Sequence, residues 1–140
     1  MPSLRDHVFV AVFDGHGGAG AAIFAEKNMV TVLEDSMAWK RYHDDPAKSS
    51  KYLGEAMIHA FVELDTLLKL HQNSTNGSDT SGCTAVTCMI TPHYYVCANI
   101  GDSRCVLGTG GESISLSIDH KPYDEEEERR VINAGGKVNW

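Results

Sequence analysis

Hydrophobic residues follow three different patterns along the chain, and each pattern predicts a different kind of element. Residues 8–13 (VFVAVF) form a short apolar run of strand-forming types, typical of a strand buried on both faces. In residues 47–71, apolar side chains recur at steps of three and four, which predicts a long amphipathic helix. From residue 83 onward, short apolar runs alternate with turn residues and predict a series of strands.

The polar positions around these runs predict two further helices. Residues 19–38 alternate apolar and polar side chains in the manner of an amphipathic helix. Residues 39–46 are expected to end this helix, and Pro46 is expected in the first turn of the long helix that follows. The last helix is expected over residues 124–134, with Asp124 as N-cap and Gly135 as its stop. Its acidic start suits the positive end of the helix dipole, and the spacing predicts the ion pairs Glu125–Arg129 and Glu126–Arg130.

The strands are expected over residues 83–90, 94–100, 103–107 and 114–118. Short connections at residues 91–93 and 101–102 predict antiparallel hairpins, because parallel strands need a much longer crossover. One strand, two long helices, an antiparallel meander and a final helix make an α+β fold, in a single domain over residues 1–140.

Composition and charge narrow the classes of partner. The chain has 140 residues, 42% of them hydrophobic, with 12 basic and 19 acidic side chains and a net charge of −7. Nucleic acids and anionic membranes are therefore poor partners. The absence of a signal-peptide pattern predicts a cytoplasmic or nuclear protein, and the four cysteines, without metal-ligand spacing, are expected to be buried, reduced thiols.

The chemistry of the chain is concentrated where the first apolar run ends, in Asp14, Gly15 and His16. An ionised carboxylate at the end of a buried strand is costly unless it binds something, and His16 adds a group that titrates near neutral pH. These residues are typical of a hydrolytic metal site. Two alternatives remain at this point: a dinucleotide-binding glycine loop through Gly15, Gly17 and Gly20, and a helix N-cap by Asp14.

Four blocks, in order and at matching spacing, resemble the metal-dependent serine/threonine protein phosphatases of the PP2C (PPM) family. They are residues 10–18 (VAVFDGHGG), 81–86 (SGCTAV), 98–104 (ANIGDSR) and 119–122 (DHKP), extended by 128–136 (ERRVINAGG). The resemblance implies an α-β-β-α sandwich of two antiparallel sheets flanked by helices. It also implies a cleft at one end of the sheets that holds two Mg²⁺ or Mn²⁺ ions.

The resemblance also assigns roles to individual residues. Asp14 would bind both metal ions through its carboxylate, and the carbonyl of Gly15 would bind one of them. His16 would be the general acid that protonates the departing serine or threonine oxygen of a phosphoprotein substrate. Asp102 would be a ligand for a weaker third metal, although Gly101-Asp102 equally suits a hairpin turn. Residues 119–122 are expected to form a structural corner instead.

The chain also departs from the family pattern. Members have longer catalytic domains, with a phosphate-binding arginine and a Glu-Asp metal ligand upstream of the Asp14 equivalent and further metal-binding aspartates downstream; Arg5 and Asp6 do not fit that pattern. We therefore expect an incomplete PP2C-like domain, corresponding to roughly the N-terminal half, with little or no turnover on its own. The alternative is a non-catalytic module that binds phosphoproteins or partners. Open sheet edges also predict a homodimer formed by element exchange.

Overall fold

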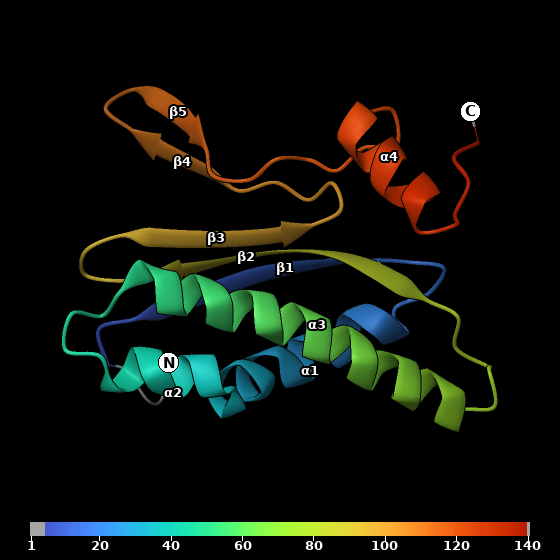
Figure 1. Ribbon diagram of the computed structural model, residues 1–140, viewed down its shortest axis with the longest axis horizontal. Helices are drawn as coiled ribbons and strands as arrows, with labels where there is room; N and C mark the ends of the chain where they lie inside the picture. The colour runs from blue at the N-terminus through green and yellow to red at the C-terminus, as the bar shows by residue number, and fades with distance from the viewer. Residues whose placement is uncertain (1–4, 140) are drawn as a thin grey trace.

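The computed structural model describes residues 5–139, which form a three-stranded sheet with helices on one face (Figure 1). The order of elements is β1 (Val8–His16), α1 (Gly20–Asp35), α2 (Met37–Asp44), α3 (Ser50–Ser74), β2 (Gly82–Ile90), β3 (Tyr95–Ile100), β4 (Val106–Thr109), β5 (Glu112–Ser115) and α4 (Glu125–Asn133). This mixture of helices and antiparallel strands confirms the predicted α+β class.

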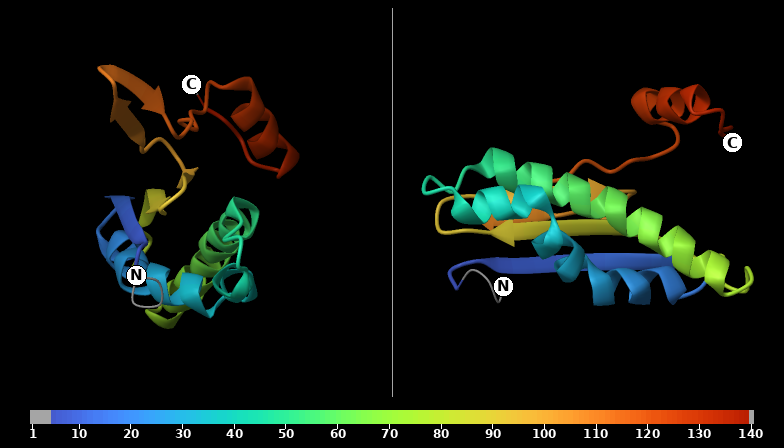
Figure 2. Two further views of the ribbon diagram at one scale, coloured as in Figure 1. Left: turned by 90° about the vertical axis from the view of Figure 1, so that its left-hand side faces the viewer. Right: turned by 60° about the horizontal axis from the view of Figure 1, so that its bottom comes forward.

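The sheet has the order β1-β2-β3, and both pairings are antiparallel. Helices α1, α2 and α3 lie together against one face, whereas the β4–β5 ribbon and α4 lie on the opposite side of the sheet (Figure 2). The core therefore forms between the helices and one side of the strands. Its fully buried members include Met29, Leu33, Leu53, Met57 and Met89.

Strand β1 corrects the expectation of a strand buried on both faces. It is an edge strand, and Val8, Val10 and Val12 are 53%, 48% and 58% exposed. Alternate residues, Phe9 and Phe13, pack against the helical core instead. The unbroken apolar run could not reveal this difference, because it presents apolar side chains to both faces of the strand.

The helical segment before α3 is also different from the prediction. Residues 39–46 were expected to interrupt the helices, but α2 occupies most of them and buries Trp39 and Tyr42. Ser36 ends α1 and caps α2, where its side chain accepts a hydrogen bond from the backbone N–H of Trp39 at 3.0 Å. The predicted helix over residues 19–38 is thus two helices joined at a serine N-cap.

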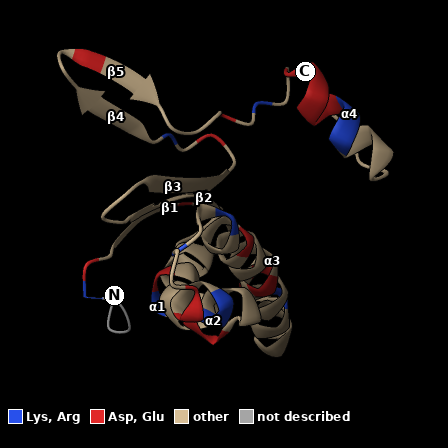
Figure 3. Cartoon of the chain, turned by 60° about the vertical axis from the view of Figure 1, so that its left-hand side comes forward, with Lys and Arg blue, Asp and Glu red and all other residues tan. Residues whose placement is uncertain are grey.

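The C-terminal third departs from the predicted meander. The β2–β3 hairpin forms as expected, but β3 does not pair with β4; instead β4 pairs with β5 as a separate ribbon. The predicted hairpin turn at residues 101–102 is therefore wrong. In α4, Arg130 pairs with Glu127 at 2.6 Å, not with Glu126, and Gly135 ends the helix at φ +82° as predicted. Figure 3 shows the acidic start and basic middle of this helix.

All four cysteines are free thiols, as predicted, but only Cys88 is fully buried. Burial raises the pKa of the thiols of Cys83, Cys88 and Cys97, which keeps them protonated at neutral pH. Within the described part of the chain, no helix is both long and apolar enough to cross a membrane.

Candidate functional site

The three residues singled out in the sequence end strand β1 at one corner of the sheet. Asp14 is paired in register with Thr84 of β2, and His16 is paired with Gly82. Side chains alternate along a strand, so Asp14 and His16 lie on the same face as the exposed valines, away from the helices. The carboxylate and the imidazole are therefore both presented on the open face of the sheet.

Glycine at position 82 makes room for the histidine. A Cβ atom at Gly82 would lie 2.5 Å from Nε2 of His16, so the imidazole ring rests directly over the bare backbone of β2. Real Cβ contacts are never this close, and any larger residue would displace the ring. The second sequence block, residues 81–86, thus supplies the surface on which the imidazole of His16 lies.

The chain turn after His16 leads directly into helix α1. Gly17 and Gly18 have positive φ angles of 67° and 137°, which few other residues adopt. The N-terminus of α1 is held by Ser81, whose Oγ accepts a hydrogen bond from the backbone N–H of Ala21 at 2.8 Å. Asp14 therefore does not cap this helix, and the N-cap alternative is wrong. The dinucleotide alternative is also wrong, because β1 pairs antiparallel with β2 and the parallel sheet it requires is not formed.

A pair of hydroxyl groups links this corner to the loop after β3. Thr84, opposite Asp14, has its Oγ1 2.6 Å from Oγ of Ser103. Gly101 has φ +81°, and a Cβ there would lie 2.6 Å from Cγ2 of Thr84. The row Asp14, Thr84, Gly101 therefore crosses the sheet from β1 to the end of β3, and Asp102 follows it.

Two ion pairs fasten the loop after β3 to the segment before α4. Arg104 donates two hydrogen bonds to the carboxylate of Asp119, at 2.9 and 2.7 Å. Lys121 forms a 2.5 Å ion pair with Asp102. These hydrogen bonds, followed by the charges of their donors, lower the pKa of both carboxyl groups. The third and fourth sequence blocks are thus held against each other, and residues 119–122 form the structural corner that was predicted.

The sequence located the chemical groups at the corner but missed their partners. The sequence does not single out Ser81, Thr84 or Ser103, although all three lie in the blocks 81–86 and 98–104. Only the pairing register brings Thr84 opposite Asp14. Lys121 lies in the segment expected to form a structural corner, and its separation of 19 residues from Asp102 gives no periodic signal for their ion pair.

The donors at this corner suit a divalent cation in kind but not in number. A carboxylate and a backbone carbonyl are the oxygen ligands that Mg²⁺ and Mn²⁺ prefer. Among residues 5–139, however, no group of three or more His, Cys, Asp or Glu side chains is arranged to hold a metal ion. Asp102 also has Lys121 as its present partner. These residues therefore make up part of a metal site, not a complete one.

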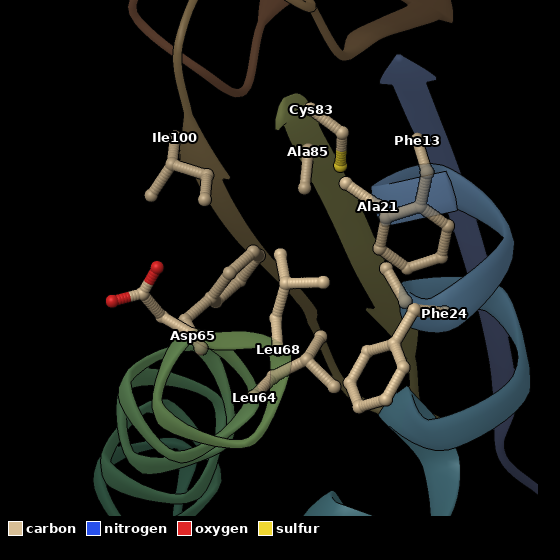
Figure 4. A pocket seen from close by; sticks show the side chains of 11 residues that line it. Phe13, Ala21, Phe24, Leu64, Asp65, Leu68, Cys83, Ala85 and Ile100 are labelled. Carbon is tan, nitrogen blue, oxygen red and sulfur yellow. The ribbon is translucent and has the colours of Figure 1, made fainter. Parts of the chain in front are cut away.

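Behind the corner, on the helix side of the sheet, lies an apolar cavity of about 60 Å³ (Figure 4). Phe13 and Cys83, the neighbours of the corner in β1 and β2, point into it together with Phe24 of α1. Burial, and then the nearby charge of Asp14, raise the pKa of the Cys83 thiol. The side of the sheet opposite the carboxylate is therefore apolar, and the charged groups have only the open face available.

Comparison with known proteins accounts for this arrangement. The family model described as "Protein phosphatase 2C" matches residues 2–140. The "Protein phosphatase 2C homolog 2" of Saccharomyces cerevisiae is 37% identical over 97% of this chain and 28% of its own length, and "Protein phosphatase 1B" of Homo sapiens is 34% identical over 96% and 29%. The chain thus spans about a third of the length of such relatives.

Solved structures agree on the fold. The serine-threonine phosphatase 2C from Toxoplasma gondii superposes with a TM-score of 0.86 at 27% identity, over all of this chain and 48% of that one. A Caenorhabditis elegans sex determining protein gives 0.80 at 29% identity, over 96% and 31%. The four sequence blocks, the corner that they build and these matches have one explanation: the chain belongs to the protein phosphatase 2C family and represents part of its domain.

Proposed function

We propose that these residues contribute one corner of the active site of a metal-dependent protein serine/threonine phosphatase, acting within a longer protein. The observation that supports this most directly is the shared face of Asp14 and His16 at the end of β1. The carboxylate of Asp14 and the imidazole of His16 are both exposed there, on either side of Gly15 in the sequence. The proposed reaction, hydrolysis of phosphoserine or phosphothreonine in a protein substrate, is taken from the family to which the chain belongs.

In this proposal the carboxylate of Asp14 and the carbonyl of Gly15 hold Mg²⁺ or Mn²⁺, together with ligands from outside this chain. When bound, such ions supply a water of lowered pKa as the nucleophile. His16 donates a proton to the serine or threonine oxygen as it leaves phosphorus. Gly82 supports this role, because it sets the position of the imidazole that has to reach the leaving oxygen.

Asp102 is the proposed ligand of a weaker third cation. Its present partner is the ammonium of Lys121, at 2.5 Å. A cation at Asp102 would therefore have to replace an existing ion pair, and this pair is partly exposed, so its replacement would cost little. The closeness of Gly101 to Thr84 supports a fixed position for this loop relative to the sheet.

A second candidate function applies to the chain by itself. Because the described residues hold no complete set of metal ligands, the isolated chain would bind a phosphoprotein or another partner without hydrolysing it. The two proposals differ in one measurable property, which is turnover that depends on a divalent metal ion.

The test measures phosphate release from a phosphoserine peptide with Mn²⁺ and with EDTA. It uses both the 140-residue chain and the longest natural gene product that contains it. We expect Mn²⁺-dependent turnover only in the longer protein, reduced by about 10²- to 10⁴-fold in His16→Ala. An exposed histidine on α3 gives the matched control, His59→Ala, which should retain full activity.

Two results would contradict these proposals. Wild-type turnover by His16→Ala would remove this residue from the reaction. Metal-dependent turnover by the 140-residue chain alone would show that its own residues suffice, against both the expected incompleteness and the non-catalytic alternative.

A further inference from the structure

A hollow lined mainly by polar and charged residues lies at the other end of the sheet, where β1 begins. It has a volume of about 200 Å³ and is bounded by the segment before β1, the loop between α2 and α3, and the turn between β2 and β3. In Figure 1 this is the left-hand end of the sheet, near the label N. Strand β1 spans nine residues, so roughly 25 Å of strand separates the hollow from His16.

The hollow gathers positive charge in a chain that is acidic overall. Arg5 and Lys48 line it, together with His7 and His93, against the single carboxylate of Asp6. Among the described residues, neither Arg5 nor Lys48 has a carboxylate within 4.0 Å. Two cations without ion-pair partners among residues 5–139 therefore line the same space.

The fold holds Lys48 in place at the mouth of this hollow. Its Nζ donates to the backbone carbonyls of Tyr42, at 3.4 Å, and His43. The ammonium also lies 5.8 Å from the centre of the Tyr42 ring. Lys48 also has φ +49°, a left-handed backbone conformation that few non-glycine residues adopt. Binding an anion here would require little ordering of the side chain.

The inner wall of the hollow includes two buried polar side chains, His7 and Tyr42. His7 is buried, and its Nε2 lies 2.5 Å from the hydroxyl of Tyr42, which is itself fully buried. Burial, and then the charge of Lys48, lower the pKa of His7 and favour its neutral form, so the positive charge of the hollow comes from Arg5 and Lys48. These two cations would attract a negatively charged ligand.

We propose that this hollow binds a phosphate group, either as inorganic phosphate or as a phosphate monoester. The guanidinium of Arg5 provides paired N–H donors that match phosphate oxygens, and Lys48 supplies a point charge. The volume accommodates a tetrahedral oxyanion with part of its hydration. This site does not depend on the proposed catalytic function, because it shares no residue with the corner at Asp14.

The test is a titration of the whole chain with sodium phosphate, followed by ¹H–¹⁵N NMR at constant ionic strength. EDTA is present throughout, so that metal-mediated binding at the Asp14 corner does not contribute. We expect saturable shifts of the amides of His7, Thr91 and His93. A second arm uses a phosphoserine peptide and its unphosphorylated form, which distinguishes a phosphate ester from free phosphate as the ligand.

The double variant Arg5→Gln/Lys48→Gln should weaken phosphate binding by about tenfold or more, because it removes two charge-assisted contacts. The matched control, Lys51→Gln/Arg129→Gln, removes the same net charge from exposed positions outside the hollow. Its affinity should stay within about twofold of the unaltered chain. Shifts that do not saturate, equal weakening in both double variants, or equal binding of the unphosphorylated peptide would each overturn the proposal.

Discussion

The two faces of the sheet differ, although the same strands form both. On the helix-covered face, Met89 and Thr87 of the central strand β2 are 0% and 1% exposed. On the open face, Val86 and Cys88 of the same strand are 6% and 5% exposed, and Val10 and Val12 of the edge strand β1 are about half exposed. The covered face stabilises the fold by burying apolar area, whereas the open face presents Asp14 and His16. Stability and proposed chemistry are therefore separated by the alternation of side chains along a strand.

Core substitutions should give the largest difference between the faces. Met89→Ala removes a fully buried side chain from the covered face and should cost about 2–5 kcal/mol of unfolding free energy. Val10→Ala, on the open face, should cost less than about 1 kcal/mol, because the valine is already half exposed. Urea denaturation followed by circular dichroism measures both, and equal costs would contradict the contrast.

Alanine at Gly101 should test how firmly the open face is joined to the loop after β3. The added Cβ would face both a left-handed backbone and a 2.6 Å approach to Thr84. We expect a loss of about 1–3 kcal/mol in unfolding free energy. Gly110→Ala is a suitable comparison, since it also has a positive φ, of 59°, but nothing within 4 Å of the added atom. A smaller loss in Gly110→Ala would assign the difference to the contact with Thr84.

The same substitution at two other glycines should have different consequences. Gly54 lies inside α3 with open space around it, so Gly54→Ala should stabilise the protein by about 0.5–1 kcal/mol. Gly82→Ala should instead displace the His16 ring and shift its imidazole NMR signals. Unchanged His16 signals in Gly82→Ala would show that the ring does not rest on this glycine.

Lowering the pH should weaken the ion pair between Arg104 and Asp119. Hydrogen bonds from Arg104 lower the pKa of this carboxyl in the folded state. The ion pair therefore contributes fully to the unfolding free energy above the pKa of this carboxyl in the unfolded chain, about 4. This contribution is lost as the pH falls through the lower pKa of the folded state. The difference in stability between the protein and Arg104→Met should narrow and disappear across this range. Arg129→Met is the matched control, and a difference that persists in strong acid would contradict the assignment.

Element exchange between two copies stays a prediction of the sequence. In the described sheet β1 and β3 are the edge strands, where an exchanged element could pair, and a second copy would also cover the exposed valines of β1. Light scattering should then give twice the chain mass of 15.3 kDa, and Val10→Glu should restore the monomer. A monomer across the micromolar range would count against exchange.

The sequence by itself determined the α+β class, the long helix α3, the end of α4 at Gly135 and the identity of Asp14, Gly15 and His16. These features depend on local periodicity, on glycine conformation and on contiguous motifs. Only the tertiary structure decided that β1 is an edge strand, that Thr84 faces Asp14 and that Lys121 pairs with Asp102.

The tertiary structure also decided that residues 106–115 form a separate ribbon and that α2 replaces a predicted break. The physical reason is the same in each case. Strand pairing and helix packing are set by contacts between residues far apart in the chain, and one sequence pattern fits several such partners. The sequence could locate the corner at Asp14 because its chemical groups are consecutive residues. Its partners come from three other segments, so their positions depend on how the whole sheet pairs.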